Sequence, residues 1–213
     1  NSDCPVCSAE DADLSACKGT EQAMSLMAAA ANTQTISGNV TWDNQTITTP
    51  VELTGDTTIT LTGDNSITIT ETDEVAALEM YYHSLTIQGS GSLTVTVPKG
   101  KHGIADSAYS DTAGGTLTIK EANVTTKGGS SGLYAKAVVI ENGKLDLNSG
   151  IGITTASLTM NSGTLYTTGS YAAIATRKGN TRSIDNSLSI LYSDQANAEV
   201  ADMLDGTVED TTK

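Results

Sequence analysis

Residues 117–165 read LTIKEANVTTKGGSSGLYAKAVVIENGKLDLNSGIGITTASLTMNSGTL, and this stretch decides the fold. One short motif occurs in it three times, two apolar residues separated by a single residue, beginning at Leu117, Val138 and Leu158. The spacing of about 20 residues lies in the range of stacked structural repeats. Alternation with a period of two predicts short β-strands that each bury one face.

Each copy of the motif is followed by two more apolar positions. The second positions are Val124, Leu145 and Leu165, and the third positions are Leu133, Ile153 and Ile174. A small residue (Ala122, Gly143 or Gly163) stands between the first two strands, where it permits a tight corner. Three strands per repeat, of irregular length and without a hexapeptide pattern, predict an all-β fold: a single-stranded right-handed parallel β-helix (β-solenoid).

The pattern extends upstream, which gives about six rungs and three regions. The upstream apolar positions are Val51, Leu53, Ile59, Leu61, Ile67, Ile69, Leu78, Leu85, Ile87, Leu93, Val95 and Ile104. We expect an N-terminal leader and capping helix over 1–32, the β-helix over 33–193, and a C-terminal cap and tail over 194–213. The helix-prone stretch EQAMSLMAAAAN at 21–32 would cover an otherwise exposed end of the stack.

Composition and charge restrict the partners. The chain lacks Phe and carries a formal net charge of −14, from 25 acidic and 11 basic residues. Such a chain repels nucleic acid phosphates and anionic lipid, and it has no apolar run long enough to span a bilayer. We therefore expect no nucleic acid partner and no membrane insertion, and we expect a monomer.

Three cysteines, Cys4, Cys7 and Cys17, cluster near the beginning of the sequence. The first two have the C-x-x-C spacing of zinc and redox sites, but neither a βαβ context nor nearby further ligands accompany them. We therefore assign no metal or redox role to these cysteines and interpret the segment as part of the leader.

Two connections are longer than the basic repeat, at residues 106–115 and 177–186. Both leave after a third strand, so we expect them at one corner, enclosing a groove with Lys136 on its floor. Two separate surface loops are an equal alternative, since loops are generally variable surface. Asp106 and Asp111 in the first loop are candidate ligands of Ca²⁺, which takes oxygen ligands.

Five residues are candidates for carbohydrate binding. Tyr109, Tyr134 and Tyr166 are expected to be exposed and could stack on sugar rings. Lys136 and Arg177 would add basic contacts in the groove. We assign no catalytic residue, because no nucleophile or acid–base grouping is readable, although Lys136 or Arg177 could serve as the base of a lyase.

The segments SLTIQGSGSLTV at 84–95 and TTITLTGDN at 57–65 resemble the repetitive β-helical, so-called carbohydrate-binding domains of surface proteins from anaerobic bacteria. The likeness covers about residues 33–193. It implies a shape similar to that of pectate lyases, polysaccharide binding that sometimes involves calcium, and an extracellular or cell-surface location. No catalytic residue can be carried over, because no lyase motif aligns.

Three functional hypotheses follow from these observations. The first is a non-catalytic extracellular or cell-surface module that binds polysaccharide or mediates adhesion. The second is a β-helical polysaccharide lyase or hydrolase, and the third is a structural stalk without a ligand. Unsaturated sugar products would select the lyase, and a lack of affinity for any polymer would favour the stalk.

Overall fold

The computed structural model describes residues 33–110, 112–167, 170–176, 182–184 and 189–192. The chain divides into two compact units, Asn1–Thr33 and Gln34–Lys213, and all described strands belong to the second. The expected capping helix at 21–32 and the tail at 194–213 lie outside the described residues. Among the residues described, no helix has the length and apolar character needed to cross a membrane.

The second unit is built from β-strands. They are β1 (Gln34–Asp43), β2 (Thr46–Ile47), β3 (Val51–Thr62), β4 (Asp64–Thr68), β5 (Ala76–Glu79), β6 (Leu85–Gln88), β7 (Ser92–Val97), β8 (His102–Ala105), β9 (Thr116–Lys120), β10 (Asn123–Gly128), β11 (Ser131–Asn148), β12 (Ile151–Thr167), β13 (Ala172–Thr176), β14 (Arg182–Ile184) and β15 (Ser189–Tyr192).

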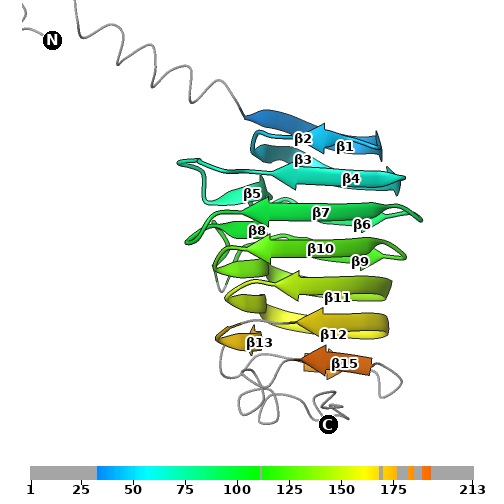
Figure 1. Ribbon diagram of the computed structural model, residues 1–213. Helices are drawn as coiled ribbons and strands as arrows, with labels where there is room; N and C mark the ends of the chain where they lie inside the picture. Colours follow the sequence, from blue (N-terminus) through cyan, green and yellow to red (C-terminus); the bar gives the residue numbers. More distant parts are fainter. Residues whose placement is uncertain (1–32, 111, 168–169, 177–181, 185–188, 193–213) are drawn as a thin grey trace, which may run out of the picture. The chain divides into compact units, whose positions relative to one another are not determined.

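The described strands pair in parallel, each with the strand one repeat before or after it, as the stacked arrows of Figure 1 show. Leu117 in β9 pairs with Val138 in β11, which in turn pairs with Leu158 in β12. The parallel structure and this register, both expected from the threefold motif, are confirmed. Parallel strands need the long crossover that a repeat of this length supplies.

The predicted fold class is wrong, because some of the parallel strands close into a ring. Six strands form a closed ring of parallel pairings, a barrel with the remaining strands outside it, in the order β11, β8, β5, β3, β6, β9 and back to β11. The expected single-stranded right-handed β-helix, with three separate strands in each rung, is therefore replaced among the described residues by a six-stranded parallel barrel.

The ring closes because strands continue through positions where we expected corners. β11 pairs with β8 near its beginning, with β9 in its middle and with β10 near its end. Its backbone accommodates the change of direction with register shifts between Ile140 and Gly143. Asn142, which lies between them, adopts a left-handed φ of 55°. A bulge of this kind bends a strand without ending its pairing.

The register also assigns partners to the upstream apolar positions. Ile59 is the partner of Ile87, and Val51 is the partner of Leu78. Arg182 pairs with Leu158 and lies in β14, so the second long connection is shorter than we expected.

A buried asparagine takes a position that leucine holds in the next repeat. Asn65 pairs with Leu93 and is 2% exposed. Its amide nitrogen donates to the carbonyl oxygens of Thr62 and Ser92, at 3.0 and 3.2 Å, and its amide oxygen accepts the N–H of Gln45 at 2.9 Å. A buried polar side chain is tolerated when its hydrogen-bonding groups are satisfied in this way.

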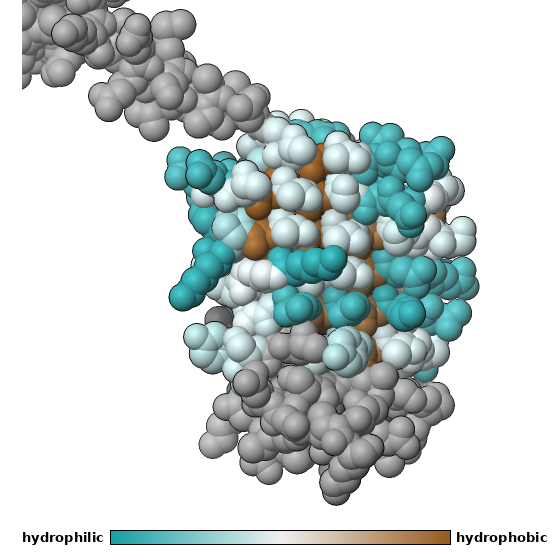
Figure 2. Space-filling view, in the orientation of Figure 1, coloured by the Kyte–Doolittle hydropathy of each residue, from teal (hydrophilic) through white to brown (hydrophobic). Residues whose placement is uncertain are grey.

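The apolar core follows the alternation of the strands. In β6 and β7 every second side chain is buried, and these residues join one continuous cluster that runs from Ile36 to Ile174. Full burial of one leucine or isoleucine side chain contributes about 1.5–3 kcal/mol. The outward positions of β4, β7 and β10 are largely Thr and Ser. In Figure 2 such residues form pale columns on this face, with brown apolar residues between them.

Candidate functional site

Two loops cover one outward column of the sheet. The column is aligned by register and consists of Glu52, Glu79, Ala105 and Tyr134, one each from β3, β5, β8 and β11. Residues 80–84 connect β5 to β6, and residues 106–115 connect β8 to β9. These loops carry Tyr81, Tyr82 and His83 in the first case and Asp106 and Tyr109 in the second. This corner is the candidate site.

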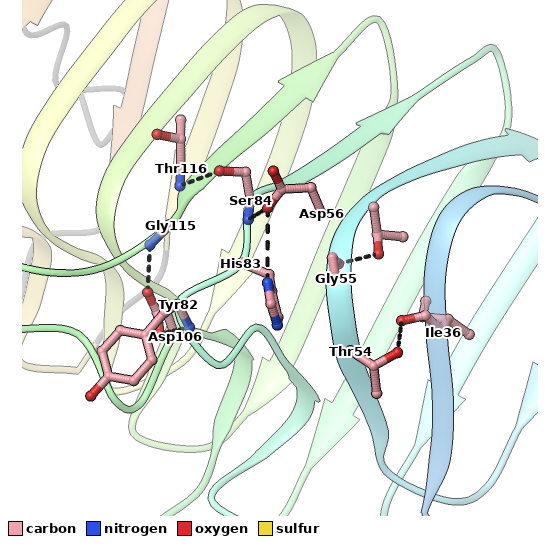
Figure 3. Close-up of polar contacts among 11 residues, drawn as sticks. Ile36, Thr54, Gly55, Asp56, Tyr82, His83, Ser84, Asp106, Gly115 and Thr116 are labelled. Atoms are coloured by element: carbon pink, nitrogen blue, oxygen red, sulfur yellow. Dashed lines mark hydrogen bonds and ion pairs between the residues drawn. The ribbon is translucent and has the colours of Figure 1, made fainter.

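Asp106 holds the two loops together. Its side chain is fully buried, with 0% exposure, and its two oxygens accept different main-chain N–H groups. Oδ1 accepts from Tyr82 at 2.9 Å, and Oδ2 accepts from Gly115 at 2.8 Å. Figure 3 shows Asp106 between these two segments. A buried carboxylate is acceptable here because each oxygen receives a charge-assisted hydrogen bond.

The loop at 80–84 presents two tyrosines in an unusual backbone conformation. Tyr81 and Tyr82 have φ values of 44° and 66°, in the left-handed region that bulky residues rarely occupy. Their side chains are 39% and 52% exposed. Strained conformations persist where surrounding contacts enforce them and are frequent at binding sites. Here the Asp106 carboxylate and a hydrogen bond from the N–H of His83 to the carbonyl oxygen of Met80 enforce the conformation.

Glu79 supports the same loop from below. It is 2% exposed, and its Oε1 accepts the N–H of Ser107 at 2.8 Å and that of Tyr81 at 3.3 Å. Its Oε2 is buried without a hydrogen-bond partner among the described residues. Burial raises the pKa of Glu79, the hydrogen bonds oppose the rise, and the charge of Asp106 adds to it.

The raised pKa of Glu79 predicts a pH dependence of stability. A carboxyl whose folded pKa lies above its unfolded value of 4.5 stabilises the fold fully below that pH and loses this contribution as the pH rises through the folded pKa. Glu79→Gln keeps Oε1 as an acceptor and abolishes the titration. We expect the free energy of unfolding of the natural chain, relative to the variant, to fall as the pH is raised above 4.5. Urea denaturation across this range measures the difference, and a constant difference would contradict the assignment.

Acidic groups surround the Tyr81 hydroxyl. It donates to Oε1 of Glu52 at 3.4 Å. Burial, with the charges of Glu52, Glu74 and Glu79, raises the pKa of Tyr81 to about 12, so the phenol stays protonated. Burial also raises the pKa of Glu52, with the neighbouring Glu74 carboxylate as the next cause. The tip of the loop, formed by Tyr81 and Tyr82, is therefore an aromatic surface with acidic residues at its edge.

The base of the same loop is fixed to both neighbouring repeats. Asp56 Oδ1 accepts the N–H of Ser84 at 2.8 Å and lies 4.0 Å from Nδ1 of His83. The Ser84 hydroxyl accepts the N–H of Thr116 at 3.3 Å. Figure 3 shows this chain of contacts running from Asp56 to Thr116.

A second aromatic group lies farther along the same column. The ring of Tyr134 stacks on His102, with centroids 4.7 Å apart, and contacts the tilted ring of Tyr109 at 5.0 Å. Tyr109 is only 7% exposed, so it packs against its neighbours and offers little surface for a ligand. Burial lowers the pKa of His102.

The other predicted site residues have different positions. Lys136 lies beside the first loop, since a Cβ added at Gly114 would come within 2.7 Å of the Lys136 Cβ. Tyr166 is 38% exposed and pairs with Asp146, on another face. Asp111 and Arg177 lie outside the described residues, so the groove between two loops stays a prediction. No group of three or more potential metal ligands occurs within the described part of the chain.

Sequence reasoning did not select Tyr81 and Tyr82 as site residues. The available signal was their adjacency, since two consecutive aromatic residues are unusual in a chain with only 4% aromatics. Their exposure depends on Glu79 and Asp106, whose hydrogen bonds involve residues distant in the sequence.

Comparison with known proteins adds no relative. A scan against protein-family models and searches of curated proteins and of solved structures found no match. The proposals below therefore rest on the geometry of the corner.

Proposed function

We propose that this chain is a non-catalytic extracellular or cell-surface module that binds polysaccharide through the tip formed by Tyr81 and Tyr82. One observation carries the proposal: two consecutive tyrosines are both exposed and both held in a left-handed conformation by buried acceptors. A folding requirement alone would favour glycine at such positions.

The chemistry of the tip suits a sugar polymer. Tyrosine rings offer a rigid apolar face together with a hydroxyl for hydrogen bonds. The loop is fixed before the ligand arrives, so little side-chain and backbone entropy is lost on binding. Glu52 and Glu74 at the rim can accept hydrogen bonds from sugar hydroxyls. In this proposal Asp106 supports the tip from within and does not contact the ligand.

Removal of the tyrosine rings tests the proposal. We expect Tyr81→Ala and Tyr82→Ala each to weaken binding to the preferred polysaccharide at least about tenfold, which corresponds to about 1.4 kcal/mol. Retardation in gels containing a panel of neutral, acidic and amino polysaccharides identifies the polymer, and isothermal titration with its oligomers measures the affinity.

Tyr171→Ala is the matched control, because Tyr171 is 74% exposed and lies outside the corner. It should leave the affinity unchanged. Affinity lost equally in the control, or retained in both tip variants, would contradict a binding site at the tip. Retardation by no polymer in the panel would favour the stalk, and release of unsaturated products would favour the lyase.

A further inference from the structure

The charge distribution around the tip is one-sided. Between Thr33 and Pro98 the sequence contains no Lys or Arg. The same stretch contains eight acidic residues, which are Asp43, Glu52, Asp56, Asp64, Glu71, Asp73, Glu74 and Glu79. All Lys and Arg residues of the described chain lie at or after Lys99. The repeats that carry Tyr81 and Tyr82 therefore form the acidic end of the described unit.

The acidic groups nearest to the tyrosines are poorly compensated. Burial and, next, the neighbouring Glu74 carboxyl raise the pKa of Glu52, and the Tyr81 hydroxyl donates a hydrogen bond to Glu52. Asp56 is 80% exposed, and its ion-pair partner among the described residues is His83, at 4.0 Å. Lys101 donates to the main-chain oxygen of Asp73, and Lys136 lies beside the loop at 106–115. Two half-buried carboxyls beside an exposed tyrosine make a surface that attracts a cation.

A glycan with amino groups fits this surface better than a neutral or uronic one. An ammonium group is attracted to the face of a tyrosine ring and forms charge-assisted hydrogen bonds with carboxylates. A uronate carboxylate would be repelled by Glu52, Glu74 and Asp56 together. A neutral sugar would stack on the rings but would leave the carboxyl pair without a counter-charge.

We infer that the polysaccharide bound at the Tyr81–Tyr82 tip is a polymer of amino sugars with free amino groups, of which β-1,4-linked glucosamine is the simplest. This inference rests on the proposed function and specifies its ligand. The tyrosines supply the stacking surface, and Glu52 and Glu74 select the positive charge.

Two oligomers of equal length and linkage separate charge from sugar recognition. One is a β-1,4-linked glucosamine oligomer, and the other is its fully N-acetylated counterpart. Isothermal titration at low ionic strength, at a pH where the amino groups are charged, should show at least about tenfold tighter binding of the amino form. Added NaCl should reduce that preference, because salt screens exposed charges.

Charge removal at the rim tests which residues are responsible. Glu52→Gln combined with Glu74→Gln should reduce the preference to within about twofold of equality while binding of the N-acetylated oligomer persists. Glu121→Gln combined with Asp146→Asn changes the net charge by the same amount at two exposed positions, one between β9 and β10 and one in β11. This control should keep the preference.

The outcomes separate the inference from the proposed function. Equal binding of both oligomers, preference for a polyuronate, or equal loss in the rim and control variants would overturn the inference and leave a glycan site at the tip. Binding of neither oligomer nor of any other polymer would refute the proposed function itself. Amino-oligomer binding that survives Tyr81→Ala and Tyr82→Ala would show attraction by net charge alone and would overturn both.

Discussion

Asp106→Asn is expected to destabilise the protein by about 3 kcal/mol, because a buried donor that loses its acceptor costs about 1–3 kcal/mol and a bond to a charged group is worth more than a neutral one. The aspartate accepts one main-chain N–H at each oxygen, from Tyr82 and from Gly115. Asparagine keeps one acceptor and turns an NH₂ group toward the other donor. Urea denaturation measures the change.

The same substitution should also release the tip. Without its acceptor, Tyr82 loses one of the contacts that enforce its left-handed φ of 66°. We expect the affinity for the glycan to fall at least about tenfold in a variant that is still folded at the assay temperature. Asp146→Asn, at an exposed position of β11, should change stability by less than about 0.5 kcal/mol. An Asp106→Asn variant as stable as this control would refute the role of Asp106.

Gly115→Ala is expected to have the second large effect. A Cβ at this position would overlap the main-chain carbonyl oxygen of His83, which cannot move without shifting the loop at 80–84. Overpacking of a well-packed site typically costs about 1–3 kcal/mol, and a clash with backbone lies at the upper end. Thermal denaturation and near-ultraviolet circular dichroism of the tyrosines follow stability and tip geometry together.

Gly55→Ala is the matched control for this clash. The Cβ at residue 55 would meet only the Cβ of Ser37, at 3.4 Å, and the backbone there needs no left-handed φ. We expect a change in stability within about 0.5 kcal/mol. Destabilisation of the same size in both glycine variants would show that the close approach of Gly115 to His83 is unimportant.

The sequence was sufficient to predict the parallel strands and much of their register. Leu117, Val138 and Leu158 stand in equivalent positions because a one-residue slip would turn every buried side chain of a strand outward. The rule does not exclude a shift of two residues, and Thr57 takes the position of Leu85, so that Ile59 pairs with Ile87. A threonine at an inward position breaks the apolar pattern from which the register was read.

Closure of the ring was not predictable from the same pattern. Alternation shows which side chains face the core, but it does not show whether a strand ends at a bend or continues through it. In β11 the pairing continues past Lys136 and through the bulge at Asn142, so that this one strand pairs with β8, β9, β10 and β12. Turn-forming residues permit a corner without requiring the strand to end there.

The candidate site was predictable only in part. Asp106 was predicted as a candidate ligand of Ca²⁺; in the structure it is buried, and both of its oxygens accept main-chain hydrogen bonds. Its partner Tyr82 lies 24 residues earlier in the sequence, and no local pattern reveals such a bond. An acidic residue in a long loop is compatible with a ligand role and with a structural one, and only its burial distinguishes them.

Pairing between successive repeats also determines how the chain can fold during its synthesis. Paired residues are separated by as few as 17 positions, as in Gln34 and Val51, and by at most 32, as in Leu85 and Leu117. Contacts between residues close in sequence form at a low entropic cost and favour rapid folding. Each repeat can therefore join its predecessor soon after it leaves the ribosome, and the tip at 80–84 acquires its Asp106 acceptor only when the following repeat has been synthesised.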